Sequence, residues 1–137
     1  MKSQISFTTD IFETRNAGAN FTNPRNFGED LAAWLVEASR ASGFKLGSPF
    51  QTEEGWTVPA EAGGEHFEIG VGIMDASIGD AQANWLITIE KTRKWKIFSS
   101  KDSTLRSELC DHIQNILRDK PHIREIRWTD QVGHFAR

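Results

Sequence analysis

The chain contains no tyrosine, a single cysteine and only four prolines among its 137 residues. The lone cysteine, Cys110, excludes an intrachain disulfide and agrees with a reducing compartment. No apolar run is long enough to span a membrane, and residues 1–7 contain no run of signal-peptide length. We therefore expect a cytoplasmic protein that folds without disulfides.

Motifs for catalysis and metal binding are missing as well. No glycine-rich phosphate-binding motif occurs, and His66, His112, His122 and His134 show no metal-ligand spacing with each other or with cysteine. Cys110 lies beside an apolar helical stripe, where a thiol is typically a core group and not a nucleophile. We expect no metal, no cofactor and no catalytic residue, which favours a protein that is not an enzyme.

Positive charge is missing from residues 46–90, which contain no Lys or Arg. The net charge is −8 over residues 1–90 and +5 over residues 91–137, which gives −3 for the chain. If the C-terminal part packs beside the acidic stretch, much of this charge is neutralised within the domain. The acidic stretch holds eight carboxylates, namely Glu53, Glu54, Glu61, Glu65, Glu68, Asp75, Asp80 and Glu90.

Two helices and several strands are predicted from periodicity. A helix is expected over residues 28–42, with Asn26 and Glu29 as a capping-box-like pair and Gly43 as its stop. A second apolar stripe runs over residues 105–117 and ends before Pro121. Alternating apolar residues predict strands over residues 4–14, 84–91 and 123–128, and residues 94–98 are an optional further strand.

Gly63 and Gly64 lie between two alternating runs and predict a two-residue hairpin turn. In that register, paired residue numbers add to 127. Pro59 suggests that its strand lies at an edge or ends there. The apolar face then pairs Ala60 with Phe67, Val58 with Ile69 and Trp56 with Val71; the other face pairs Glu61 with His66, Pro59 with Glu68, Thr57 with Gly70 and Gly55 with Gly72.

The predicted element order is β-α-β-β-β-(β)-α-β, within a single domain over residues 1–137 and a tail from residue 130. Hairpin connections imply an antiparallel sheet. Each helix has one apolar face, which must be buried against another layer. We therefore predict an α+β, two-layer sandwich in which two helices cover a mainly antiparallel sheet of five to six strands.

The hairpin register also indicates two candidate binding features. His66 faces Glu61 and has Glu68 beside it, which suits an acid–base group or a ligand group with a raised pKa, or a surface ion pair. Gly70 and Gly72 leave a gap on the same face that permits close approach of a ligand, a partner or an aromatic side chain of the chain itself.

A basic segment follows the acidic stretch. Residues 91–96 place four cations around Trp95, and Arg118, Lys120, His122, Arg124 and Arg127 form a second basic run. Basic residues interleaved with aromatics can bind single-stranded nucleic acid. The sequence pI of about 5.8 argues instead for a solvated turn that pairs with the acidic residues.

Residues 23–31 (Asn-Pro-Arg-Asn-Phe-Gly-Glu-Asp-Leu), Trp34-Leu35, Gly43-Phe44 and Gly55-Trp56 resemble a family of small uncharacterised bacterial α+β proteins. The resemblance covers about residues 22–73, roughly half of the chain. It implies a bacterial cytoplasmic accessory protein. It implies no activity and no site residue.

The leading hypothesis is a non-enzymatic protein-binding module, immunity-like or chaperone-like, that holds a basic protein on an acidic sheet face. The alternatives are a nucleic-acid or small-ligand module that uses Lys91 to Lys96, and a small hydrolase that uses His66 with nearby carboxylates. Glu65 is expected to add to the charge of the acidic face. The candidate binding residues are Phe50, Glu53, Glu54, Glu61, His66, Glu68, Gly70, Gly72 and Asp75.

Overall fold

The computed structural model describes residues 4–16, 18, 21, 26–53, 55–74, 78–92 and 104–129. It confirms the α+β class, but the antiparallel sheet has seven strands. The extra strands are two short ones inside residues 45–51, where no strand is predicted from the sequence. The elements are β1 (Gln4–Thr9), α1 (Glu29–Ala38), β2 (Lys45–Leu46), β3 (Phe50–Gln51), β4 (Trp56–Ala62), β5 (Glu65–Ile73), β6 (Ala83–Lys91), α2 (Thr104–Asp119) and β7 (Ile123–Thr129).

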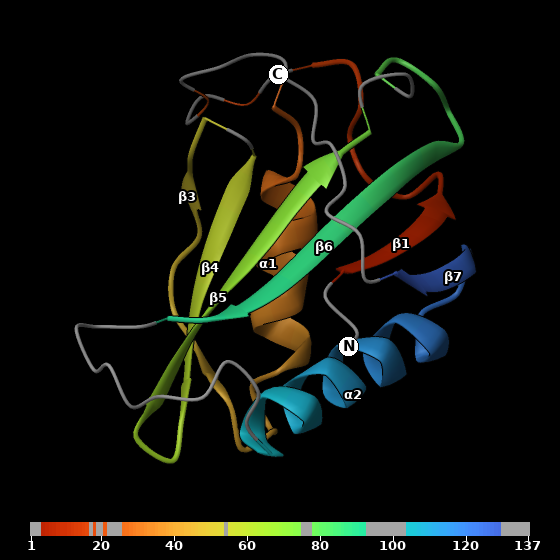
Figure 1. The fold of residues 1–137 in the computed structure, drawn as a ribbon. Helices are drawn as coiled ribbons and strands as arrows, with labels where there is room; N and C mark the ends of the chain where they lie inside the picture. The colour runs from red at the N-terminus through yellow and green to blue at the C-terminus, as the bar shows by residue number, and fades with distance from the viewer. Residues whose placement is uncertain are drawn as a thin grey trace.

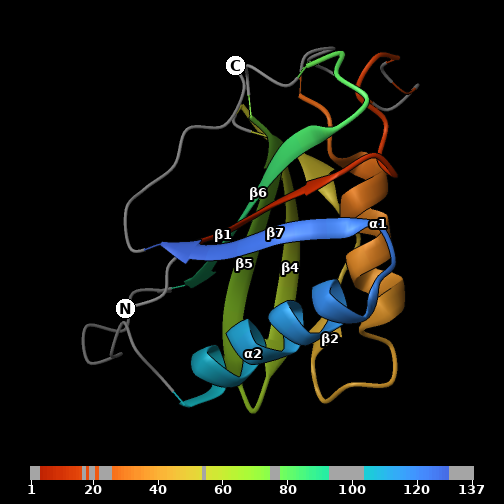
Figure 2. The ribbon, with the colours of Figure 1, turned by 90° about the vertical axis from the view of Figure 1, so that its right-hand side faces the viewer.

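The strand order in the sheet is β2-β4-β5-β6-β1-β7, with β3 also paired to β4. Both helices lie on one side of the sheet (Figures 1 and 2). The core between these layers is formed by alternate residues of the strands and by the apolar stripes of the helices, and Cys110 of α2 is buried in it. We call the sheet face opposite the helices the outer face. The described strand residues on it include Phe50, Thr57, Pro59, Glu61, His66, Glu68, Gly70, Thr88 and Glu90.

The β4–β5 hairpin has the predicted register. Gly63 and Gly64 have φ values of 56° and 80°, as a primed turn requires. Every pair from Ala62 with Glu65 to Trp56 with Val71 adds to 127. The predicted pairing of Gly55 with Gly72 is wrong, because the ladder begins at Trp56. Gly72 instead faces Leu86 on β6.

Pro59 lies inside the sheet, so the prediction that its strand is an edge or ends there is wrong. The main-chain nitrogen of Gly47 donates to the Pro59 oxygen at 2.8 Å. The nitrogen and oxygen of a strand residue point the same way, so the missing N–H of Pro59 faces the gap between β2 and β3. The β4–β5 ladder loses no hydrogen bond, which explains why the proline is tolerated.

The start of α1 differs from the capping-box prediction. Gly28 is the N-cap residue, and no side chain caps the helix. Asn26 is only 1% exposed, and its Nδ2 donates to the main-chain oxygens of Thr52 and Glu53 at 3.2 and 3.0 Å. Asn26 therefore links the entry of α1 to the β3–β4 loop.

The predicted helix over residues 28–42 ends early, at Ala38. Ser39 follows it, and the Ser42 hydroxyl donates to the Ser39 main-chain oxygen at 2.7 Å. This local hydrogen bond replaces the last turn of the expected helix, so Gly43 is not the residue that stops it. The stripe over residues 105–117 is confirmed as helical, since α2 spans Thr104–Asp119.

The edge strand β7 contains an irregularity opposite Phe7. The β1–β7 register shifts between Ser6 and Thr8, and Glu125 has a φ of 56°. The Thr8 hydroxyl lies 2.9 Å from Oε2 of Glu125. The extra residue forms a β-bulge in this strand.

Candidate functional site: the outer face of the sheet

The outer face brings together side chains from five strands, β2 to β6. In an antiparallel sheet, directly opposed residues lie on the same face. Three rows of opposed residues therefore cross this face, and they are Lys45, Glu61 and His66; Pro59, Glu68 and Glu90; and Phe50, Thr57, Gly70 and Thr88.

Three exposed carboxylates, Glu61, Glu68 and Glu90, form what we call the acidic patch. Glu68 of β5 directly faces Glu90 of β6. Within the described part of the chain, no Lys, Arg or His forms an ion pair with any of the three. Like charges directly opposed on neighbouring strands repel each other. The patch is therefore a local concentration of negative charge without a counter-ion from the described residues.

Phe50 marks the border of the acidic patch. It is 50% exposed, which makes it one of the two large apolar side chains found exposed among the described residues. It faces Thr57 on β4, and that row continues through Gly70 and Thr88. An exposed aromatic residue therefore lies at the end of a row of small residues, next to the negative charges.

A hollow of about 240 Å³ opens beside the acidic patch, where β2 meets β4. Gly47 and Pro59 form part of it, and Lys45, Glu61 and His66 supply its charged and polar groups. We call it the Gly47 hollow. Its full lining is Lys45, Leu46, Gly47, Pro59, Ala60, Glu61 and His66.

Five of the predicted binding residues lie together on the outer face: Phe50, Glu61, His66, Glu68 and Gly70. Gly72 is on the same face but is buried, as is its partner Leu86, which is 2% exposed. Glu53 is exposed in the β3–β4 loop, and Glu54 and Asp75 lie outside the described residues.

The prediction placed Glu65 on the wrong face of the sheet, and it did not include Glu90 among the site residues. Glu65 lies on the helix side, where Nζ of Lys91 is 3.3 Å from its Oε1. Glu90 was not predicted as a site residue. No two-residue turn joins β5 to β6, so the sequence does not fix which of their residues face each other. The strand alternation over residues 84–91 is the signal that places Glu90 on the same face as Leu86 and Thr88.

Among the described residues, the basic side chains neutralise only part of the acidic stretch. Lys91 pairs with Glu65, and residues 93–100, which include Trp95 and the optional strand over 94–98, lie outside the described residues. Arg124 and Arg127 are on β7, two strands away from β6. Two strand spacings are about 10 Å, a distance over which exposed charges are largely screened at physiological salt.

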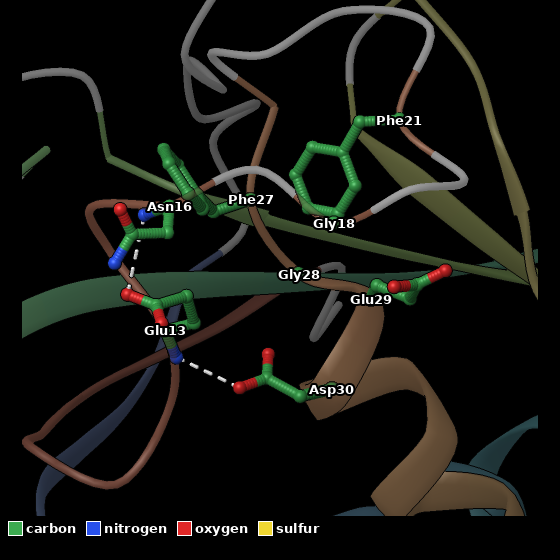
Figure 3. A pocket seen from close by; sticks show the side chains of 8 residues that line it. All are labelled: Glu13, Asn16, Gly18, Phe21, Phe27, Gly28, Glu29 and Asp30. Atoms are coloured by element: carbon green, nitrogen blue, oxygen red, sulfur yellow. Dashed lines mark hydrogen bonds between the residues drawn. The ribbon is translucent and has the colours of Figure 1, made fainter.

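A second pocket, of about 110 Å³, lies at the start of α1. Its lining combines Phe21 and Phe27 with carboxylates of Glu13, Glu29 and Asp30 (Figure 3). Asp30 accepts a hydrogen bond from the Glu13 main-chain nitrogen at 2.7 Å. Glu13 accepts three hydrogen bonds in turn, from the main-chain nitrogens of residues 14–16.

The electrostatics of this pocket agree with a structural role. Hydrogen bonds from the Arg15 and Asn16 main chain hold the pKa of Glu13 below its usual value. Asp30 is exposed as a residue, yet loss of water around its carboxylate raises its pKa. Two of the three carboxylates therefore fasten the loop after β1 to the first turn of α1.

Ser39 and His112 form a pair that sequence reasoning did not find. The Ser39 hydroxyl lies 2.8 Å from Nε2 of His112, a distance also seen between nucleophile and base in hydrolases. Ser39 is only 1% exposed, so no substrate reaches its hydroxyl. Phe44 stacks on the His112 ring at 5.8 Å, and burial lowers the pKa of this imidazole. The pair joins the end of α1 to α2.

Comparison of the chain with protein-family models, with curated proteins and with solved structures gives no match. The resemblance to a bacterial family therefore stays a prediction. In the described ranges, no group of three or more His, Cys, Asp or Glu side chains is arranged to hold a metal ion. None of the described helices combines the length and the apolar character needed to cross a membrane.

Proposed function

We propose that this protein is a non-enzymatic binding module that holds a basic protein on its acidic patch, in the manner of an immunity-like inhibitor or a chaperone. The observation that carries the proposal is the direct opposition of Glu68 and Glu90, both exposed. A cationic surface that docks between them replaces repulsion by attraction. Because these carboxylates are exposed, their attraction mainly speeds association and selects the partner.

Phe50 supplies binding affinity, to which exposed charges contribute little. Affinity in protein interfaces is concentrated in a few residues, often aromatic ones, that fill a pocket of the partner. Phe50 is half exposed and lies on the same face as the acidic patch. The charges therefore steer the partner, and Phe50 anchors it.

The test is an NMR titration of ¹⁵N-labelled protein with an amidated hexa-arginine peptide, with a hexa-glutamate peptide as control. We expect the arginine peptide to shift amide signals of β4, β5 and β6 at low salt, and high salt to reverse the shifts. The double reversal Glu68→Lys with Glu90→Lys should abolish them. Reversal of Glu108, an exposed residue of α2, is the control for a charge reversal outside the patch.

The result that contradicts the proposal is a shift pattern on the helix side, or one that the double reversal leaves unchanged. The same variants serve to identify the partner. A basic protein captured from native lysate by the wild type and by the Glu108 control, but not by the double reversal, is the partner that the acidic patch selects. If wild type, the Glu108 control and the double reversal all capture the same protein, the acidic patch does not select it.

A further inference from the structure

The Gly47 hollow lies at one end of the acidic patch, where it includes Glu61 and shares Pro59 with the row that contains Glu68. Its volume of about 240 Å³ is below the range of roughly 300–1,000 Å³ found for small-molecule pockets. It therefore suits one side chain of a protein partner better than a cofactor or metabolite. Gly47 contributes to the space because it carries no side chain opposite Pro59.

The lining of the hollow has two kinds of surface. Pro59 offers an exposed apolar ring and Glu61 an exposed carboxylate, whereas the side chains of Leu46 and Ala60 belong to the core. A side chain that matches both needs an apolar stem and a cationic end. Arginine and lysine both meet this requirement.

Two features favour arginine. Its planar guanidinium can bond a carboxylate such as Glu61 through two nitrogens and can stack on the flat ring of His66, which lies directly opposite Glu61. Guanidinium also loses hydration more easily than ammonium, which matters beside the apolar ring of Pro59. Lysine has neither advantage.

Among the described residues that line the hollow, Lys45 of β2 is the one Lys or Arg, and it lies opposite Glu61 of β4. Lys45 is exposed, and the described structure contains no ion pair between it and Glu61. Its flexible stem lets the ammonium move into solvent when another cation arrives. Lys45 therefore competes with the incoming side chain for Glu61 but does not fill the hollow.

We infer that the Gly47 hollow receives a single arginine side chain of the basic partner, with the guanidinium against Glu61 and the stem against Pro59. This inference rests on the proposed function of the acidic patch. It adds that the patch selects arginine over lysine, which charge alone does not do.

The experiment compares the affinities of hexa-arginine and hexa-lysine peptides for the full chain. We expect wild type to prefer arginine about five-fold, equivalent to ~1 kcal/mol. Gly47→Ala narrows the hollow, because its Cβ would lie 3.0 Å from Cγ of Pro59, and should bring the ratio close to one. Gly43→Ala, which meets no atom within 4 Å, is the matched control and should keep the preference.

Glu61→Gln provides a second test that does not depend on how β2 tolerates a new side chain. Glu61 is exposed, and its replacement should also remove the arginine preference while the salt dependence from Glu68 and Glu90 remains. Lys45→Gln should raise affinity for arginine. Equal binding of the two peptides by wild type overturns the inference and leaves the proposed function standing. Binding of neither peptide overturns both.

Discussion

The indole nitrogen of Trp56 donates a hydrogen bond to the main-chain oxygen of Asn26 at 2.8 Å. The bond ties the first residue of β4 to the segment that enters α1. The Asn26 side chain reaches the same region in the other direction, toward Thr52 and Glu53. Asn26 thus holds two parts of the chain together through both its backbone and its side chain.

Asn26→Ala should lower the free energy of unfolding by about 1–3 kcal/mol, because the buried Asn26 side chain makes two hydrogen bonds that the variant loses. Chemical denaturation followed by tryptophan fluorescence measures the change. Asn115→Ala, at an exposed position of α2, is the control and should not destabilise the protein. Equal stability of wild type and the Asn26 variant would show that the link contributes nothing.

Glu90→Gln should raise the free energy of unfolding by ~0.5 kcal/mol, because it removes the repulsion from Glu68. High salt screens exposed charges, so the gain should shrink in concentrated NaCl. Glu108→Gln, an exposed α2 residue, removes the same charge away from the patch and serves as the reference. A gain of the same size in both variants would reflect net charge and would argue against a local repulsion.

His112 should make stability depend on pH. Burial lowers its pKa from the ordinary value of 6.5, so below that pH the unfolded chain binds a proton more readily than the native one. The contribution of His112 is therefore constant well above pH 6.5, and stability falls as the pH drops below that value. In denaturation curves, the stability advantage of wild type over His112→Gln should therefore be largest near pH 8 and should shrink as the pH falls below 6.5. Parallel pH profiles would exclude this effect.

Gly55→Ala should destabilise the fold by at least about 2 kcal/mol. A Cβ at this position would lie 2.3 Å from the Val71 main-chain oxygen, and the residue has a φ of 155°. Gly43→Ala is expected to stay within about 0.5 kcal/mol of wild type because its Cβ meets open space. Thermal unfolding of the two variants compares them directly. A stable Gly55→Ala protein would mean that β5 moves to accommodate the methyl group.

The hairpin could be predicted residue by residue because its information is local. Gly63 and Gly64 accept positive φ, and a two-residue turn then determines every pair of β4 with β5. The strand period of two assigns Glu61, His66 and Glu68 to one face from that register alone. This is why most of the acidic patch was placed correctly.

The entry to α1 could not be predicted in the same way. Asn26 fits a local capping pattern, but its hydrogen-bond partners Thr52 and Glu53 lie more than twenty residues later in the chain. Tertiary contacts of this kind outweigh a cap that contributes about 1 kcal/mol. The opposition of Glu68 and Glu90 escaped prediction for a related reason, since the β5–β6 connection is too long to set a register.

The two sides of the sheet end in irregular backbone. On one side, residues 47–49 interrupt the border between the short strands β2 and β3, opposite Pro59 of β4. On the other side, Glu125 forms the bulge of β7. Within the described ranges, neither border offers a long straight row of free N–H and C=O groups to a foreign strand. Such rows are what allow sheets of separate molecules to join and grow into aggregates. The chain can therefore carry a face ready for a partner while its borders resist self-assembly by strand addition.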